Sequence, residues 1–224
     1  MENLHSHHEN RWIILGIMSL SLVIVMLNNV TLNVALPKLA IDLGADNSQM
    51  QWIVDAYALI FGGTLLVMGS LGDRFGRKNA LQVGMVILAS SAGWAAFYAD
   101  TANQVIAARA IMGLGAALVM PATLSIVIVV FPKNERGKAI GIWAAMAGIG
   151  APIGLLVGGY IMEHYQWQDI FLINVPIIFL ALIIGAKYVP QSKETTTTPL
   201  DWVGSILSIV ALSSILFGII EGPN

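Results

Sequence analysis

The sequence of residues 69–78 is Gly69-Ser-Leu-Gly-Asp-Arg-Phe-Gly-Arg-Lys78, a short glycine-rich stretch that carries one acid and three bases. Apolar runs flank it on both sides, at residues 52–71 and 81–98. A helix that crosses about 30 Å of hydrocarbon needs roughly 20 predominantly apolar residues, so both runs are long enough to span a membrane. The stretch is therefore predicted to be a tight turn between two spanning helices, with its charges in water.

The same alternation of apolar runs and charged stretches extends over the rest of the chain. Of the 224 residues, 57% are hydrophobic and 11% are charged, which is too apolar for a soluble domain. The expected fold class is therefore an all-α membrane protein. The predicted spanning segments are residues 12–32, 52–71, 81–98, 104–130, 139–161, 170–189 and 202–220.

Two of these runs have an alternative interpretation or an irregular feature. Arg11 precedes the first run, as in a secretory signal peptide, but this run is longer than a signal's apolar region and lacks a small-residue cleavage site. An uncleaved first helix is therefore expected. Pro121 lies inside the long fourth run and predicts a kink there, with the end of the helix near Phe131.

The basic residues fall almost entirely on one side of the predicted membrane. Of the eleven Lys and Arg residues, Arg109 lies within a run and Lys38 lies in an outer segment if the N-terminus is cytoplasmic. The other nine then lie in cytoplasmic segments, so the positive-inside rule predicts a multi-pass protein of the inner (plasma) membrane with a cytoplasmic N-terminus. They are Arg11, Arg74, Arg77, Lys78, Lys133, Arg136, Lys138, Lys187 and Lys193.

Composition excludes several functional classes. The absence of cysteine excludes disulfides, thiolate metal sites and thiol nucleophiles, and a net charge of −2 gives no indication of nucleic-acid binding. No group of His, Ser, Asp or metal-ligand residues gathers at one membrane depth, so neither an enzyme nor a metal or cofactor site is expected. A repeated filter sequence, which a channel requires, is also absent.

Besides Lys187 near the cytoplasmic end of the sixth run, two charged residues lie inside apolar runs and are the main candidates for function. Burying Arg109 in hydrocarbon costs at least a few kcal/mol, which favours a functional role over a snorkelling structural arginine. Asp55 is the only carboxylate clearly within a run. It is expected to be a cation-attracting site, a proton carrier or an interface residue near the headgroups. At 1.5 Å rise per residue, Asp55 lies about 6 Å and Arg109 about 9 Å below the outer surface. They are predicted to meet if their helices face one cavity.

Residues 69–78 resemble the signature between helices 2 and 3 of major facilitators, Gly-x-Leu-x-Asp-Arg-x-Gly-Arg-Lys. The charges by themselves are also compatible with a positively charged anchor that only sets the topology. However, a match at so many fixed positions within ten residues is specific to the signature. The resemblance implies a cytoplasmic gate whose contacts change as the transporter alternates between outward and inward states. The matching gate residues are Gly69, Asp73, Arg74, Gly76, Arg77 and Lys78, together with Leu71.

Two further segments resemble the drug/proton antiporter branch of the same family. Arg109 and residues 112–117 resemble the helix 4 signature, in which the arginine is implicated in proton coupling, although Met112 replaces a glutamine. Residues 27–37 resemble the helix 1 signature, with Asn28 at the position of the membrane carboxylate. Because an amide carries no proton at any working pH, another acid must carry it if coupling is retained.

The fifth and sixth runs also carry family patterns. Glycines spaced four apart in the fifth run form a small-residue face that permits close helix packing. They also resemble the antiporter signature Gly-x8-Gly-x3-Gly-Pro-x2-Gly-Gly, with Leu155 in place of the proline. Residues 166–176 resemble the family's Trp-Arg-Trp-Ile-Phe-x-Ile-Asn-x-Pro, with Gln168 and Asp169 in place of the arginine and second tryptophan. The signature glycines of the fifth run are Gly141, Gly150, Gly154, Gly158 and Gly159.

The resemblance covers residues 28–223 and implies the N-terminal half of a fourteen-helix quaternary-ammonium or multidrug exporter. The expected parts are a cytoplasmic tail (1–11), a six-helix major facilitator bundle (12–190), a cytoplasmic linker (191–200) and an additional central helix (201–224). The implied function is export of lipophilic, cationic drug-like compounds in exchange for protons by alternating access. The implied partners are the drug, protons, membrane lipid, and either a C-terminal half or a second copy. A non-transporting sensor or assembly factor derived from a transporter is the alternative.

Overall fold

The computed structural model describes residues 10–192 and 202–221, and within these ranges the regular structure is entirely helical. Five helices are long, and two shorter ones, α7 (Asp169–Leu172) and α8 (Asn174–Tyr188), follow each other as one apolar segment. These six segments are long and apolar enough to cross a membrane, which confirms the all-α membrane fold class. The long helices are α2 (Arg11–Leu43), α3 (Asn47–Phe75), α4 (Arg77–Tyr98), α5 (Ala102–Val130) and α6 (Arg136–His164).

Local sequence explains where the helices begin and end. Helices α3 and α5 each begin with a capping box, formed by Asp46 with Gln49 and by Thr101 with Gln104, which satisfies free backbone N–H groups. Helix α2 extends 11 residues past the predicted run at residue 32, through Pro37, and ends at Gly44 in a left-handed conformation. The apolar count underestimates this helix because its last three turns are more polar.

The sixth span is interrupted where the prediction was continuous. Helix α7 ends at Leu172 and α8 begins at Asn174, so Ile173 separates them. Pro176 lies four residues after Leu172 and has no N–H to donate to the Leu172 carbonyl. The proline therefore accounts for the break, whereas the prolines inside α2, α5 and α6 leave those helices continuous.

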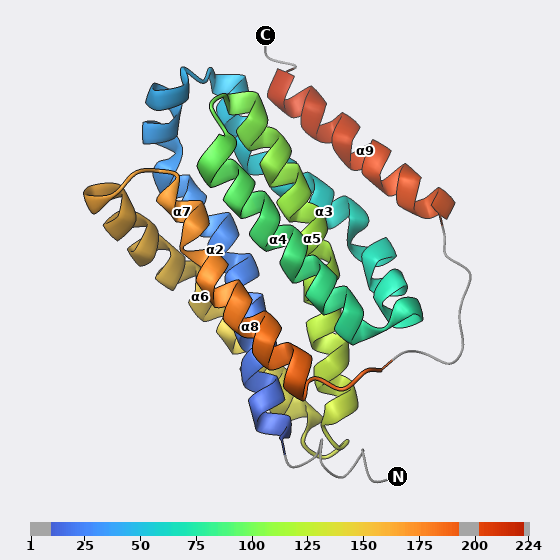
Figure 1. The fold of residues 1–224 in the computed structure, drawn as a ribbon. Helices are drawn as coiled ribbons and strands as arrows, with labels where there is room; N and C mark the ends of the chain where they lie inside the picture. The colour runs from blue at the N-terminus through green and yellow to red at the C-terminus, as the bar shows by residue number, and fades with distance from the viewer. Residues whose placement is uncertain (1–9, 193–201, 222–224) are drawn as a thin grey trace.

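Helix α5 lies at the centre of the bundle and packs against α2, α3 and α4 (Figure 1). Close approach depends on glycine, because a Cβ on Gly113 would lie 2.7 Å from the Tyr57 carbonyl of α3. On the other side of α5, a Cβ on Gly115 would lie 2.8 Å from the Gly84 carbonyl of α4. The two glycines of the predicted helix 4 signature thus allow contact with two different neighbours.

The seventh run forms α9 (Trp202–Glu221), a helix that lies apart from the main bundle and crosses the outside of α3 (Figure 1). Ile209 of α9 packs over Gly63, where an added Cβ would lie 3.0 Å from the Ile209 Cγ1. The rings of Phe217 and Trp52 make a second contact at 6.5 Å between centroids. The predicted tail falls mainly, and the predicted linker mostly, outside the described residues.

Candidate functional site

Arg109 of α5 is fully buried in the middle of the bundle and connects three helices. Its Nε donates to the Ile53 carbonyl of α3 at 3.1 Å, and its Nη1 donates to the Asn28 carbonyl of α2 at 3.0 Å. Its Nη2 lies 3.5 Å from Oδ1 of Asn29, at the limit of a hydrogen bond. Within residues 10–192 and 202–221, no carboxylate forms an ion pair with this guanidinium. Carbonyl and amide dipoles therefore provide the hydrogen bonds that solvate this buried positive charge.

The ring of Tyr57 covers one face of the same guanidinium, with the Arg109 Cζ 4.3 Å from the ring centroid. This tyrosine is 2% exposed, and its hydroxyl donates to the Val25 carbonyl of α2 at 3.2 Å. A cation over an aromatic face is attracted by the ring quadrupole, most strongly where water is excluded. Sequence reasoning assigned no role to Tyr57, although its position one helical turn after Ile53 places both on the same face of α3.

Asp55 does not meet Arg109, although the two lie at similar depths. The side chains of Gln49 and Asn103 hydrogen-bond at 3.1 Å, so α3 and α5 begin at the same level. However, Asp55 precedes Tyr57 by two residues, about 200° around the helix axis at 3.6 residues per turn. It consequently faces an open cavity of ≈ 520 Å³ at this end of α2 and α3, where Leu36, Gln51 and Val54 are among its neighbours.

Asn28 occupies a buried position beside the guanidinium, but its side chain is not a ligand of Arg109. The amide Nδ2 donates to the Ile24 carbonyl of the same helix at 3.1 Å, and only the backbone carbonyl of Asn28 reaches Arg109. Met112, which replaces the glutamine of the family signature, is also fully buried. Neither substituted position therefore provides an ionisable group near the arginine.

The predicted gate residues surround the turn between α3 and α4. Asp73 and Arg77 form an ion pair at 2.6 Å across the turn, and Gly76 between them has φ +112°. This φ is strained for residues other than glycine, and an added Cβ at Gly76 would also require the Gln191 side-chain amide to shift. Asp73 lines a cavity of ≈ 360 Å³, together with Gly69 of its own helix and residues of α5 and α6.

Two other basic residues of this turn make different contacts. Lys78 donates to the Ala186 carbonyl near the end of α8 at 2.7 Å, where the helix dipole favours a cation. The backbone N–H of Arg77 donates to the Ser192 carbonyl at 2.9 Å, which fixes the start of the predicted linker against the turn. Arg74 is exposed and lies near the ring of Phe75, 5.7 Å from its centroid.

The five signature glycines of α6 divide into two groups. Gly150, Gly154 and Gly158 are buried against α2, where added Cβ atoms would lie 2.9 to 3.2 Å from Met26, Val30 and Thr31. By contrast, Gly141 and Gly159 have no neighbour within 4 Å of an added Cβ. Only the three glycines spaced four apart serve the close packing of α6 on α2, in agreement with the predicted small-residue face.

Comparison with known proteins agrees with this architecture. The family model described as "Major Facilitator Superfamily" matches residues 18–220. The chain is 36% identical over 208 residues to the methyl viologen resistance protein SmvA of Salmonella typhimurium, covering 92% of this chain and 42% of SmvA. It is 37% identical over 217 residues to the riboflavin transporter RibZ of Clostridioides difficile, covering 96% of this chain and 47% of RibZ.

The solved structures give the same fold. A crystal structure of the peptide transporter POT in complex with sulfate superposes with a TM-score of 0.71 at 18% identity. The superposition covers 94% of this chain and 46% of the transporter. The chain thus spans less than half the length of SmvA, RibZ and the solved transporter.

Proposed function

The chain belongs to the Major Facilitator Superfamily, and from this membership we propose that it forms the N-terminal bundle of a proton-coupled exporter of drug-like compounds. The family consists of transporters rather than enzymes. Because the chain covers 42% of SmvA and 47% of RibZ, a second bundle of similar size is proposed to complete the transporter. Alternating access then moves the two bundles about a shared site near the midplane.

The observation that carries this proposal is the burial of Arg109 without a carboxylate partner in the described residues. A charge inside a membrane protein costs free energy, and such residues usually mark ion or substrate pathways. Arg109 also connects α2, α3 and α5 through its carbonyl partners. A change in its interactions during proton movement would therefore be transmitted to all three helices, which is the requirement for coupling.

Asp55 is proposed to attract the cationic substrate or to carry the proton. Asn28 cannot titrate, so the carboxylate in the open cavity between α2 and α3 is the group available for this role. Similarity to a methyl viologen resistance protein supports an organic cation as substrate, whereas similarity to a riboflavin transporter supports a neutral heterocycle. The transport assay should therefore include both kinds of compound.

The gate is proposed to lie at the turn between α3 and α4. The ion pair between Asp73 and Arg77 is partly exposed. Asp73 also borders an open cavity that is lined by residues of α3, α5 and α6. Such a contact can be exchanged when the bundles move, so substitution at Asp73 is expected to slow turnover without weakening substrate binding.

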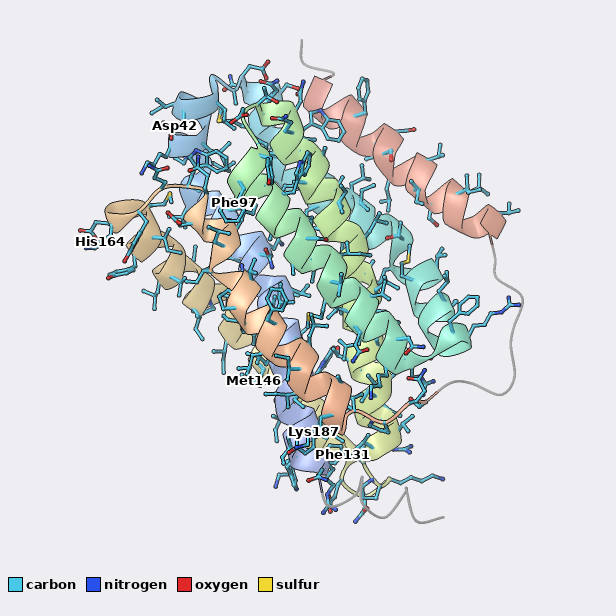
Figure 2. All side chains as sticks on the ribbon, in the orientation of Figure 1. Asp42, Phe97, Phe131, Met146, His164 and Lys187 are labelled. Atoms are coloured by element: carbon cyan, nitrogen blue, oxygen red, sulfur yellow. The ribbon has the colours of Figure 1, made fainter. Side chains whose placement is uncertain are left out.

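We also propose an inner-membrane location with a cytoplasmic N-terminus. Lys187, near the end of α8, lies at the end of the bundle where α2 begins, and Asp42 lies at the opposite end (Figure 2). Lys78 of the α3–α4 turn bonds the Ala186 carbonyl, so the basic turn lies at the same end as Lys187. By the positive-inside rule, the end that carries the bases faces the cytoplasm.

The test is proton-driven export by the complete transporter in liposomes, with Arg109→Lys as the variant. We expect at least tenfold slower proton-coupled flux, because an ammonium cannot reproduce the fixed fork that contacts Ile53 and Asn28. Substrate-driven proton movement and drug flux should be measured together. Unchanged coupling in Arg109→Lys would contradict the role of Arg109, and movement of neither species by the unmodified protein would favour the sensor alternative.

A further inference from the structure

A third cavity, of ≈ 360 Å³, lies between the end of α6 and α7, away from Arg109, Asp55 and Asp73. Its volume is within the range of small-molecule sites, roughly 300–1,000 Å³. Its lining residues are Tyr160, Ile161, Tyr165, Asp169, Leu172 and Ile173. This lining combines two phenol rings and one carboxylate with three aliphatic side chains.

The aromatic side of this cavity is held in position by its neighbours. The rings of Tyr160 and Tyr165 lie 6.3 Å apart at 51°, so they form two walls that are inclined to each other. His164, which projects at the end of α6 in Figure 2, stacks on Tyr160 at 4.5 Å and contacts the Tyr160 carbonyl through Nδ1 at 3.0 Å. Inclined aromatic faces are the arrangement that recognises ammonium groups.

Asp169 supplies the negative charge of the cavity. Its Oδ2 accepts a hydrogen bond from the Gln166 backbone at 3.1 Å, and a carboxylate has further acceptor capacity. Asp169 stands where the family pattern has tryptophan, so this charge is a property of this chain rather than of the signature. The cavity therefore favours a cation over a neutral molecule of the same shape.

The cavity also has an orientation with respect to the membrane. Tyr165 lies in the connection between α6 and α7 and Asp169 is the first residue of α7, whereas Leu172 and Ile173 lie further into the span. A molecule with a charged head and an apolar tail matches this order, since the head meets the aromatic rings and the carboxylate while the tail follows the aliphatic residues.

We propose that this cavity binds the ammonium head of a cationic amphiphile. Two basic residues of the described chain lie beside the cavity, His164 stacked on Tyr160 and Lys38, whose ammonium donates to the Tyr165 carbonyl at 2.9 Å and opposes binding of a cation. This site does not depend on the proton coupling proposed above. A negative result in the binding experiment would therefore leave the proposed transport function untouched, and the reverse also holds.

The experiment measures binding of radiolabelled dodecyltrimethylammonium to the chain in phosphatidylcholine nanodiscs, with empty nanodiscs subtracted. We expect saturable binding that is weakened at least fivefold by Asp169→Asn and by Tyr160→Ala, because the first removes the charge and the second removes a π face. Tyr160→Phe should bind as the unmodified chain does, since the ring is retained. Lys38→Gln should bind severalfold more tightly, because a like charge is removed.

Matched controls use groups that lie elsewhere on the chain. Tyr98→Ala and Asp100→Asn remove an exposed tyrosine and an exposed acid that do not line the cavity, and both should leave binding unchanged. Equal binding of the zwitterion dodecyldimethylamine oxide, or equal loss in the control variants, would overturn the proposal. Loss of binding when half of the lipid is phosphatidylethanolamine would assign the cavity to a lipid headgroup instead.

Discussion

Tyr57 and Arg109 show how a charge is accommodated in a bundle that provides no counterion among the described residues. The guanidinium receives two good carbonyl contacts and one weak amide contact, and the phenol ring covers a face that would otherwise meet only hydrocarbon. The Tyr57 hydroxyl in turn is held by Val25 of α2. The ring thus belongs to α3, is held in place by a hydrogen bond to α2, and contacts an arginine of α5.

Two replacements of Tyr57 should distinguish the contribution of its ring from that of its hydroxyl. Tyr57→Phe keeps the π face and is expected to retain proton-coupled transport within about twofold, whereas Tyr57→Leu is expected to lose about tenfold, as for a desolvated cation–π contact of 1–2 kcal/mol. The measurement is the pH dependence of flux in liposomes, with thermal stability as a check on folding. Equal activity of the Phe and Leu variants would show that the ring has no role.

Asp55 leads to a prediction about substrate charge. Asp55→Asn should reduce export of organic cations more severely than export of neutral compounds, because an unpaired carboxylate in an open cavity attracts cations. Competing export of one cationic and one neutral substrate by the complete transporter measures the difference. Equal retention of both activities would exclude this role for Asp55.

At the scale of the element, α6 packs mainly on α2 and has smaller contacts with α5, among them the hydrogen bond from Trp143 to Thr123. Gly150, Gly154 and Gly158 face α2, while about half of the large apolar residues of α6 are exposed, among them Ile149, Leu155 and Leu156. The helix therefore depends mainly on the seam with α2 for its position in the described bundle. Substitutions along this seam should affect stability far more than substitutions on the open side.

Two neighbouring glycines provide a matched test of this seam. An added Cβ at Gly158 would lie 3.2 Å from the Thr31 carbonyl oxygen, whereas Gly159 has nothing within 4 Å. Gly158→Val is therefore expected to destabilise the protein by about 1–3 kcal/mol through overpacking, and Gly159→Val should have little effect. The midpoint of thermal unfolding in detergent, measured by size-exclusion chromatography of heated samples, compares the two. Similar midpoints for both variants would mean that α6 moves away from α2 at little cost.

At the scale of the whole molecule, the described residues form one bundle, and its helices have exposed apolar faces. The exposed side of α6 and the cavity beside Asp55 both lie on surfaces that no described helix covers. The likeness to POT covers 46% of that transporter, which agrees with a bundle of half length. We therefore expect residues 1–224 to need a second bundle for function.

Expressed by itself, this chain should insert into the membrane but should not transport. Insertion is expected because each helix satisfies its own backbone hydrogen bonds and the basic loops specify orientation. Transport should fail because alternating access requires two bundles around one site, and self-association through the exposed faces is expected. Membrane extraction, sizing in nanodiscs and drug uptake by liposomes test the three statements. Proton-dependent uptake by the purified chain without a second polypeptide would contradict the half-transporter interpretation.

The membrane-spanning segments and the turn between α3 and α4 were predictable from the sequence, because hydrocarbon demands long apolar runs and the charges between them must reach water. The contacts of Arg109 were not predictable in the same way. These helices are apolar on nearly all sides, so the hydrophobic periodicity that marks the buried face of a soluble helix is weak here. Only the packed bundle fixed the rotation of each helix, and that rotation turned Tyr57 toward Arg109 and Asp55 away from it.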